Sequence, residues 1–490
     1  MIYPTLQEAG EILAGGNYKR IPISTELNSD MITPMMAVKK LKKVSRHIFM
    51  LESAEADKKW GRYTMLGFDP TLEITCQNGN LTIKSGIEVK EKVNHPREAI
   101  RKILADNNAP VLKGMPPFAG GLVGYFSYDY IKYSEPSLAL DAKDEESFKD
   151  VDLMMFDKVI VFDNYRQKII LISNIKTEDL DTAYNKGVVD LMSMKQLLLE
   201  GDMAENIPLR LESDFRYLFN KEEYCNMVEK GKHYIHEGDI FQIVLSNRIE
   251  ADISGSLLDT YRALRMTNPS PYMFYFASDD IEMAGASPET LVKMENGVLH
   301  TFPLAGTRPR GASDEEDARL EKELLADEKE RAEHNMLVDL GRNDIGKISK
   351  IGTVEVESYM DVLKYSHVMH IGSTVRGVIR DDMDALDAID SVLPAGTLSG
   401  APKLRACELI CQLENNKRGI YGGAIGYIDF TGNLDTCIAI RLAFSKNGKV
   451  FVRSGAGIVA DSVPENEYQE CINKAKAVMN ALKMAEGGID

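Results

Sequence analysis

The sequence lacks several features that define other classes of protein. Only 6 of its 490 residues are cysteines, and no two of them form a CxxC pair, so a disulfide framework is excluded. No run of about 18 apolar residues occurs, which argues against a membrane-spanning helix. The opening stretch MIYPTLQEAGEIL has neither the basic region nor the apolar region of a signal peptide. We therefore expect a cytoplasmic protein.

An excess of basic residues is also missing. The chain carries 58 Lys and Arg against 75 Asp and Glu, a formal net charge of -17. This charge argues against nucleic acid or an anionic membrane as the main partner. The composition, with 44% hydrophobic and 27% charged residues, is that of an ordinary globular protein. If the substrate is an anion, a local feature must overcome the negative field.

Hairpin signals predict antiparallel strands along the whole chain. Asn78-Gly79 and Asp163-Asn164 lie between alternating apolar runs in the first part, and Asn296-Gly297, Gly432-Asn433 and Asn447-Gly448 do so in the second. Strands joined by tight turns are antiparallel, which excludes a doubly wound parallel sheet. We expect an α+β fold in which antiparallel β-sheets pack as a sandwich with flanking helices.

Two acidic, turn-rich stretches interrupt these signals. Residues 134–150 read as a loop and residues 200–215 as a connector. We place the main boundary at the connector, which gives an N-terminal part of residues 1–215 and a second part of residues 216–490.

Two long amphipathic helices are predicted in the second part. One follows Ser313, with the capping-box residue Glu316 three positions on, and runs to Gly341. The other follows Ser462 and has Pro464 in its first turn. Each helix buries one face.

Each helix carries a pair of glutamates at a spacing of three residues, which places the pair on one face: Glu330 with Glu333, and Glu467 with Glu470. Taken singly, such pairs usually lie on a solvated face. Two pairs that border apolar faces could instead meet across a cleft as oxygen ligands of Mg²⁺. Spacing alone leaves both interpretations open.

The glycine-rich segments exclude nucleotide motifs but leave an anion site possible. Gly400 is followed by Ala-Pro-Lys and therefore does not complete a Walker A loop, and SGAGIVA lacks the third glycine of a dinucleotide site. Gly455, Ala456 and Gly457 can still present backbone N–H groups to a carboxylate. Arg441 lies in DTCIAIRLAF, which reads as an apolar strand, and a buried charge there needs a carboxylate partner from the protein or the substrate.

The two histidines of YSHVMH do not form a metal pair in this interpretation. The surrounding β-branched residues favour a strand, and an odd separation sends His367 and His370 to opposite faces. At most one of them faces a cleft, either as a hydrogen-bonded structural histidine or as a proton-transfer group.

Six motifs, in order, resemble the chorismate-binding enzymes, most closely the members that form anthranilate as the large subunit of a two-subunit enzyme. The motifs are PLAGTRPRG, ERAEHNMLVDLGRND, YSHVMH, LPAGTLSGAPK, YGGAIGYIDFTGNLDTCIAIR and GAGIVADSVPENEYQE. The resemblance is strong over residues 220–480. In the first part it is looser, through MLES and GGLVGYFSYD.

The resemblance implies a Mg²⁺-dependent conversion of chorismate to anthranilate. Ammonia attacks the ring, the ring hydroxyl leaves, and pyruvate is then eliminated. Glu333 and Glu470 would bind Mg²⁺, with Glu330 and Glu467 nearby, and the metal would hold the ring carboxylate beside the amides of residues 455–457. A cation between the carboxylates would let a dianionic substrate sit among them.

Further residues gain roles from the resemblance alone. Glu289 would be the general acid for the departing hydroxyl, and His370 would assist proton removal in the elimination. Four others would contact or line the substrate site: Tyr421 and Arg441 at the enolpyruvyl carboxylate, Lys474 near the ring carboxylate, and Thr397 beside the ring.

Two positions distinguish the relatives. Water-using isochorismate and salicylate synthases carry a lysine base where this chain has Gln242, and a neutral amide favours ammonia over water. Many aminodeoxychorismate synthases carry a lysine nucleophile where this chain has Ala305, which offers none. An aminodeoxychorismate synthase of the folate branch that lacks this lysine remains the runner-up.

The resemblance also implies feedback inhibition by L-tryptophan, through the first part of the chain. MLES and NPSPYMF correspond to the inhibitor site, in which Glu52 and Ser53 would meet the amino acid and Pro271, Tyr272 and Met273 would line the pocket. The alternative is a strand and a loop that simply pack together.

The implied partner is a glutamine amidotransferase subunit. No GxCxG nucleophile motif occurs, so this chain should not hydrolyse glutamine itself and would receive ammonia within a heterotetramer of two large and two small subunits. A third possibility is a catalytically silent, tryptophan-binding regulatory subunit. The full set of catalytic and metal-binding candidates argues against it.

Overall fold

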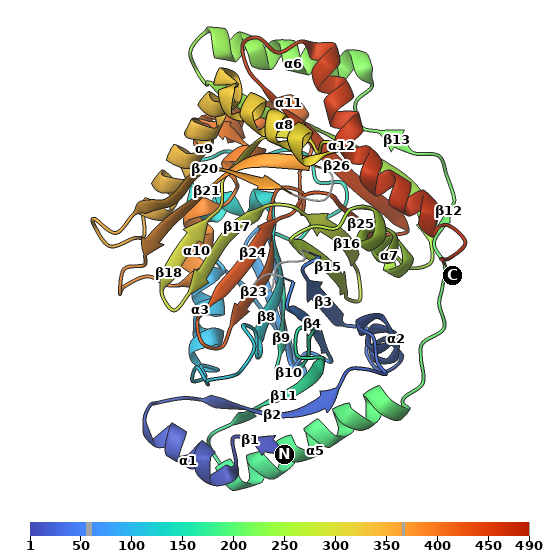
Figure 1. Cartoon of the computed structure of the whole chain (residues 1–490), viewed down its shortest axis with the longest axis vertical. Coiled ribbons are helices and arrows are strands. Elements are labelled where there is room, and N and C mark those ends of the chain that lie inside the picture. Colours follow the sequence, from blue (N-terminus) through green and yellow to red (C-terminus); the bar gives the residue numbers. More distant parts are fainter. Residues whose placement is uncertain (55–60, 365–367, 490) are drawn as a thin grey trace.

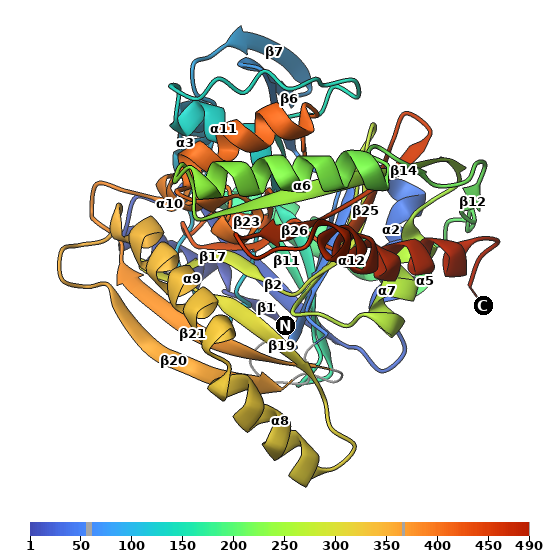
Figure 2. The same cartoon turned by 90° about the horizontal axis from the view of Figure 1, so that it is seen from above.

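The computed structural model describes residues 1–54, 61–364 and 368–489. Within these residues the strands form two antiparallel sheets that pack face to face, and helices cover the outer surfaces (Figures 1 and 2). The predicted α+β fold of packed antiparallel sheets with flanking helices is confirmed. His367 lies outside the described residues.

The first sheet has 14 strands in the described part of the chain. Its main path from edge to edge is β1 (Ile2–Tyr3), β2 (Arg20–Asn28), β11 (Lys168–Lys176), β10 (Lys158–Asp163), β4 (Tyr63–Phe68), β3 (Ile48–Glu52), β15 (Tyr272–Ala277), β16 (Glu282–Ser287), β25 (Leu442–Lys446), β26 (Lys449–Ile458), β14 (Gln242–Ser254) and β12 (Arg210–Leu211). Two short strands, β13 (Arg216–Tyr217) and β22 (Gly400–Ala401), also pair with β14.

The second sheet has 12 strands in the same described ranges. Its path is β19 (Leu304–Pro309), β21 (Val368–Val378), β18 (Val298–Thr301), β17 (Thr290–Glu295), β24 (Leu434–Ile438), β23 (Ala424–Asp429), β8 (Gly121–Phe126), β9 (Val151–Phe156), β5 (Leu72–Gln77), β6 (Asn80–Ser85) and β7 (Ile87–Lys92), with β20 (Glu355–Lys364) beside β21. Both sheets combine strands from the two sides of residue 215. β3 pairs with β15, for example, and β8 pairs with β23.

Side chains of one strand alternate between two cores. On β10, Val159 and Val161 point into the space between the sheets, whereas Ile160 and Phe162 point to the helices outside. This is the period of two that a strand buried on both faces must show. The interior between the sheets is rich in aromatic rings, such as Phe49 and Phe156 at 4.7 Å between centroids.

The helices fall into two outer layers and a set of short connecting turns. The first sheet is covered by α1 (Leu6–Ala14), α2 (Pro34–Val44), α5 (Leu180–Glu200), α7 (Leu258–Thr267), α12 (Pro464–Ala485), α6 (Lys221–His236) and α11 (Lys403–Glu414). The second sheet is covered by α3 (Arg97–Ala105), α8 (Asp314–Ala326), α9 (Glu328–Gly346) and α10 (Ala385–Val392). Short turns are η1 (Tyr128–Tyr130), α4 (Ile131–Ser134) and η2 (Gly396–Leu398).

The Asn-Gly hairpins form as the sequence predicts. Asn78 and Gly79, which join β5 to β6, have φ values of 50° and 76°, and Asn296-Gly297 repeats this geometry between β17 and β18. Two successive residues with positive φ define the type I′ turn, whose twist matches that of the strands it joins.

The prediction of one continuous helix from Ser313 to Gly341 is wrong. The helix is broken at Asp327 into α8 and α9, because the Asp327 carboxylate accepts the N–H groups of Lys329 and Glu330 as an N-cap. The same carboxylate accepts a hydrogen bond from Arg308 at 2.9 Å. The second predicted helix, α12, starts at Pro464 as expected.

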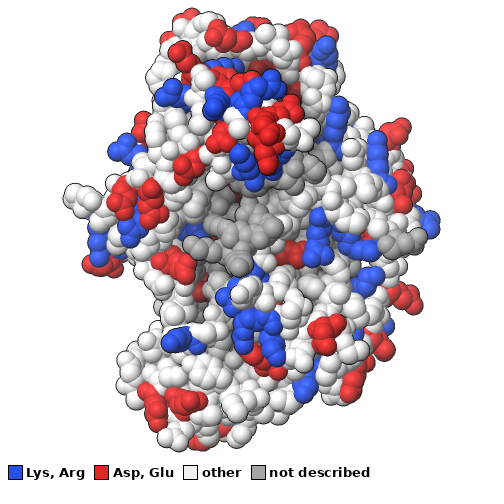
Figure 3. All heavy atoms as spheres, in the orientation of Figure 1, with Lys and Arg blue, Asp and Glu red and all other residues white. Residues whose placement is uncertain are grey.

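Charged side chains are interspersed on the face shown in Figure 3, where neither sign gathers into a single large patch. No helix in the described ranges is both long and apolar enough to cross a membrane.

Candidate functional site

A cavity of about 640 Å³ lies where α9 and α12 approach the ends of both sheets. It contains almost every residue that the sequence singled out for catalysis, substrate binding or metal binding. These are Gln242, Glu289, Glu330, Glu333, His370, Thr397, Tyr421, Arg441, Gly455, Gly457, Glu467, Glu470 and Lys474. Ala305, at the position that distinguishes the relatives, lines the cavity too.

Ala456 is the exception among the predicted residues. Its side chain is fully buried in the core beneath α6 and α11, whereas Gly455 and Gly457 face the cavity. A Cβ on Gly457 would lie 2.8 Å from Nε2 of Gln242, and one on Gly455 would lie 2.7 Å from the carbonyl oxygen of Leu245. The backbone of Leu245 therefore requires glycine at position 455, whereas a side chain at position 457 would displace the end of the Gln242 side chain.

β26 reaches the cavity with one open edge. β25 pairs with β26 only as far as Val452, while β14 pairs with it up to Ile458. In the described part of the chain, the segment with Gly455 and Gly457 therefore has a strand on one side only. Backbone groups on the other edge are available to an anion such as a carboxylate.

Glu289 is held in the short loop between β16 and β17. Thr397, in η2, donates its hydroxyl to Oε1 of Glu289 at 3.1 Å. Burial raises the pKa of Glu289 to about 7, although the Thr397 hydrogen bond and the charges of Arg441 and Lys474 act to lower it. A carboxyl group that is half protonated near neutrality is suited to donate a proton to a leaving group.

His370 lies on β21 with a defined ring orientation. Its Nδ1 lies 2.8 Å from the carbonyl oxygen of Gly306 and 3.1 Å from the hydroxyl of Thr307. Because a carbonyl can only accept, Nδ1 carries the hydrogen and Nε2 is the basic nitrogen. Burial lowers the pKa of His370, the Gly306 contact raises it and Arg441 lowers it. The ring is therefore a neutral base at pH 7.

Arg441 occupies a corner between the two sheets, although its apolar surroundings had suggested a continuous strand. β24 ends at Ile438 in the second sheet and β25 begins at Leu442 in the first, and Arg441 turns the chain with a φ of 51°. This left-handed conformation costs a non-glycine residue about 1–3 kcal/mol. Burial lowers the pKa of Arg441, and the charge of Glu289 raises it. The strained corner presents a cation to the cavity.

Tyr421 and Lys474 complete the predicted substrate contacts. Tyr421 lies in the loop before β23, and its side chain is buried in the cavity wall. Lys474 on α12 forms an ion pair with Glu470 at 2.7 Å, and its Nζ donates to the carbonyl oxygen of Gly455 at 3.2 Å. The lysine thus links the glutamates of α12 to the glycine segment.

The four predicted glutamates line one cavity from two helices. Burial, and then the charge of Glu330, raise the pKa of Glu333, and Glu470 on the facing helix raises it further. Burial and Glu470 likewise raise the pKa of Glu467. Carboxylates that raise one another's pKa form a site that a cation would stabilise.

This donor set fits Mg²⁺ bound together with a substrate. Among the described residues, no three His, Cys, Asp or Glu side chains come close enough to hold a metal by themselves. Mg²⁺ commonly takes one or two carboxylates and fills its remaining positions with water and an anionic substrate. Glu333 and Glu470, from opposite helices, provide such a pair.

Sequence reasoning missed Arg453 and Lys329, which also line the cavity. Arg453 lies in the apolar run VFVRSGAG, and the argument that pointed to Arg441 would have found it, because a buried charge requires partners. Lys329 gives no such signal. It is an exposed helix residue in sequence and faces the cavity only because α9 begins after Asp327.

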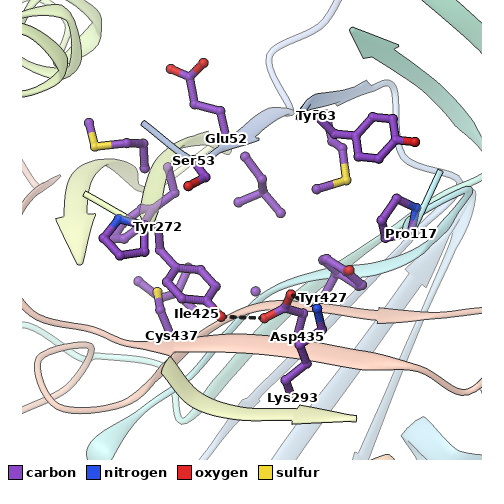
Figure 4. A pocket seen from close by; sticks show the side chains of 16 residues that line it. Glu52, Ser53, Tyr63, Pro117, Tyr272, Lys293, Ile425, Tyr427, Asp435 and Cys437 are labelled. Atoms are coloured by element: carbon purple, nitrogen blue, oxygen red, sulfur yellow. Dashed lines mark hydrogen bonds and ion pairs between the residues drawn. The ribbon is translucent and has the colours of Figure 1, made fainter. Parts of the chain in front are cut away.

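A second cavity, of about 320 Å³, lies between the two sheets (Figure 4). All five residues predicted for the inhibitor site line it: Glu52, Ser53, Pro271, Tyr272 and Met273. They meet because β3 pairs with β15, which places Glu52 opposite Met273. The second sheet closes the cavity with Lys293, Tyr427, Asp435 and Cys437, none of which the sequence had indicated.

The Glu52 carboxylate points away from the other side chains labelled in Figure 4. It accepts hydrogen bonds from Tyr261 and, at 3.2 Å, from Thr64, and it forms an ion pair at 2.8 Å with Arg265, which like Tyr261 lies on α7. Glu52 therefore borders the cavity while its charge is bound to a helix that packs against α12.

Tyr272 connects the second cavity to the first. Its hydroxyl donates to Asp435 at 2.8 Å and lies 3.0 Å from the hydroxyl of Thr290. Thr290 follows Glu289 directly, and the carbonyl of Glu289 accepts the N–H of Ile438 at 3.0 Å. The strand pair β17–β24 thus lines the second cavity and holds the backbone of Glu289, whose side chain lines the first.

Comparison with known proteins agrees with this geometry. The family model described as chorismate binding enzyme matches residues 47–480. The chain is 45% identical to anthranilate synthase component 1 from Acetivibrio thermocellus, over 99% of each chain, and 44% identical to that from Aquifex aeolicus, over 96% of each. The crystal structure of anthranilate synthase component I from Streptococcus pneumoniae superposes with a TM-score of 0.74 at 37% identity, covering 85% of this chain and 92% of that one.

A cavity at the ends of two antiparallel sheets and a family match over most of the length together define the class: the chain belongs to the chorismate-binding enzyme family. Its full-length relatives, at 41–45% identity, place it within that family among the anthranilate synthase component 1 proteins.

Proposed function

We propose that the 640 Å³ cavity converts chorismate and ammonia into anthranilate, pyruvate and water, the first step of tryptophan biosynthesis. One observation carries the assignment to this cavity: the predicted catalytic, substrate and metal residues are spread along the chain from Gln242 to Lys474, and all but Ala456 line a single space. The cytoplasm is the compartment we expect for this reaction.

Substrate binding would use the cations of the wall against the negative field of the chain. Arg441 and Tyr421 would hold the enolpyruvyl carboxylate, and Lys474 with the backbone of Gly455 and Gly457 would hold the ring carboxylate. Glu333 and Glu470 would bind Mg²⁺, with Glu330 and Glu467 close by through water, and the ion would supply positive charge at the ring carboxylate.

Two proton transfers would follow from the residues of the cavity. As ammonia bonds to the ring, Glu289 would protonate the departing hydroxyl, which leaves as water. The basic Nε2 of His370 would then take the proton from the aminated carbon, and the ring C–O bond to the enolpyruvyl group would break as the ring becomes aromatic. Gln242 has a neutral amide, which supports ammonia rather than activated water as the nucleophile.

Incubating the purified chain with chorismate, ammonium and Mg²⁺ tests the proposal, with products separated by chromatography. We expect anthranilate and pyruvate in equal amounts. Isochorismate, aminodeoxychorismate or no turnover would each contradict the assignment. An aminated ring that still carries the enolpyruvyl group would show that the elimination step is missing.

For the second cavity we infer binding of L-tryptophan as feedback inhibitor, with the first part of the chain contributing Glu52 and Ser53. The volume of about 320 Å³ suits an amino acid with a bicyclic side chain, and the lining combines aromatic rings with Asp435 and Lys293. We also expect a glutamine amidotransferase as component II, in a heterotetramer of two large and two small subunits.

A further inference from the structure

Two arginines and one glutamate form a buried cluster behind the wall of the catalytic cavity. Arg418 is 2% exposed, Arg453 3% and Glu414 2%. The Glu414 carboxylate accepts from Arg418 at 2.5 and 2.9 Å and from Arg453 at 2.8 Å. It also accepts from the amide and the hydroxyl of Ser246 at 2.7 and 2.9 Å. These donors saturate the carboxylate. Because the cluster contains two arginines and one glutamate, it holds one positive charge in excess.

The guanidinium of Arg418 has further bonds to the backbone of the cavity wall. Nη1 donates to the carbonyl oxygen of Leu398 at 2.5 Å, and Nη2 donates to that of Val244 at 2.7 Å. Leu398 is the residue after Thr397 in η2, and Val244 lies two residues after Gln242 on β14. One planar group therefore fixes the two backbone segments that carry Thr397 and Gln242.

Arg418 is itself held rigidly. Its guanidinium lies 4.6 Å from the ring centroid of Tyr128. The preceding residue, Lys417, is bound by Asp144 and Asp150 at 3.2 Å each, and the N–H of the following residue, Gly419, donates to Asp129 at 2.8 Å. The residues before and after Arg418 are thus both fixed by carboxylates, which holds the guanidinium in place relative to η2.

Stability alone gives little reason for such a cluster. Replacing a buried ion cluster by apolar residues of similar volume is often neutral or stabilising, because desolvation offsets the attraction between the charges. The bonds of Arg418 to Leu398 and Val244, however, reach toward the cavity, and Thr397 in the same turn donates to Glu289 at 3.1 Å.

We propose that Arg418 is a positioning residue of this reaction: it fixes η2, so that the hydroxyl of Thr397 stays on the carboxyl group of Glu289. The inference rests on the proposed role of Glu289 as proton donor. Arg418 acts through Thr397 and touches no substrate. When η2 loosens, the hydrogen bond from Thr397 that lowers the pKa of Glu289 is lost, and burial then raises that pKa against the charges of Arg441 and Lys474 alone.

The first test is Arg418→Lys, which keeps the charge but cannot bind Glu414, Leu398 and Val244 with one planar group. We expect kcat to fall about 10- to 100-fold, as a misplaced catalytic group commonly costs. The KM for chorismate should stay within about threefold, since Arg441 is untouched. The alkaline limb of the kcat profile should move to higher pH. Arg405→Lys, on the exposed side of α11, is the matched control and should leave all three quantities unchanged.

The second test asks whether Arg418 acts through Thr397. Thr397→Val removes the donor directly and should move the alkaline limb in the same direction. In the double variant Arg418→Lys with Thr397→Val, the alkaline limb of the kcat profile should lie at the same pH as in Thr397→Val alone. Additive shifts, or a wild-type kcat and pH profile in Arg418→Lys, would overturn the inference.

A folding defect is handled by a charge-balanced variant. If Arg418→Lys does not fold, Arg418→Gln removes the excess positive charge of the cluster and leaves Glu414 paired with Arg453 at 2.8 Å. A lower unfolding temperature with unchanged kcat and pH limb in that variant would mean a purely structural role and would also overturn the inference. Failure of the proposed function is a separate result, because wild-type protein would then form no anthranilate.

Discussion

Glu289 shows most clearly, at the scale of a single residue, how surroundings give a side chain its chemistry. In the sequence it is an acid in the loop segment ASPET, with no signal of its own beyond the family resemblance. In the structure it is enclosed between η2 and the β17–β24 ladder, and its pKa is raised to about 7.

Because Glu289 is enclosed, we predict that it lowers the stability of the folded state at neutral pH while it serves as the proton donor. A carboxyl group whose folded-state pKa is raised from 4.5 to about 7 destabilises the folded state progressively as pH rises between these values. The shift corresponds to at most about 3 kcal/mol at pH 8. We therefore expect Glu289→Gln to unfold at a higher temperature than wild type at pH 8 and at nearly the same temperature at pH 4.5, while turnover is lost. Scanning calorimetry at both pH values measures this, and an equal difference at the two pH values would contradict it.

Glu333 is the residue on which the metal assignment depends. Glu333→Gln keeps the size of the side chain and removes a carboxylate oxygen pair that Mg²⁺ would use. We expect Mg²⁺-dependent turnover to disappear while the circular dichroism spectrum is unchanged. Glu328→Gln, an exposed change in the same helix that does not line the cavity, is the control. Unchanged activity of the Glu333 variant at saturating Mg²⁺ would refute the ligand role.

Ser53 offers the corresponding test of the inhibitor cavity. Ser53→Phe adds an aromatic ring to a space of about 320 Å³ and should exclude a tryptophan side chain. We expect inhibition by tryptophan to weaken at least about tenfold, the effect of losing roughly 1.4 kcal/mol of binding, with uninhibited turnover retained. The same substitution at Ser85, an exposed residue outside both cavities, should leave inhibition as it is. An equally inhibited Ser53 variant would remove the assignment.

The break between α8 and α9 matters at the scale of the element, because it sets where α9 begins and which of its faces meets the cavity. The sequence analysis predicted the N-cap at Ser313 but missed the second N-cap at Asp327. The signal was present, since Asp327 and Glu330 have the spacing of a second capping box. The Asn-Gly turns were predictable because their geometry is local. The corner at Arg441 was not, since no nearby residue shows that the chain passes from one sheet to the other there.

Removing the cap should weaken the metal site indirectly. Asp327→Ala leaves the first N–H groups of α9 without their acceptor, at a cost of about 1 kcal/mol, and leaves Arg308 with Glu330 as its remaining carboxylate partner. We expect the Mg²⁺ concentration for half-maximal activity to rise, because Glu330 and Glu333 lie in the first turns. Asp327→Ser retains a capping oxygen and should recover most of the affinity. Equal Mg²⁺ requirements in the two variants would show that the cap does not act on the site.

The whole molecule is organised by pairings between distant parts of the chain. The hairpins within each part could be read from the sequence, but the pairing of β3 with β15 and of β8 with β23 could not, since such contacts have no local signature. The candidate residues of the catalytic cavity were found through motifs that the family resemblance joined together. Spacing alone left the glutamates open to a solvated interpretation. Arg418 and Glu414 lie only four residues apart, but they were missed because Ser246 and Arg453, which complete the cluster, are distant in the sequence.

The shared sheets predict that the two parts of the chain fold only together. Strands of residues 1–215 pair with strands of residues 216–490 in both sheets, so either part alone would lack the partner strands that the other supplies. We expect each fragment, produced alone, to be aggregated or largely unfolded. A protease site inserted in the exposed connector around residues 201–206 should leave the cleaved protein associated and active. Size-exclusion chromatography with activity assays tests both, and a stable, active second fragment alone would contradict the prediction.

Thr290, whose hydroxyl contacts Tyr272 of the second cavity, directly follows Glu289 of the first cavity in the chain, and this has an evolutionary consequence. A lineage that needs an enzyme insensitive to its end product can change the second cavity only at positions that leave the proton donor undisturbed. β17 and β24 line the second cavity and flank the loop that holds Glu289, so changes there would alter regulation and chemistry together. Natural variation in sensitivity should therefore accumulate on β3 and at the start of β15, which border the second cavity alone.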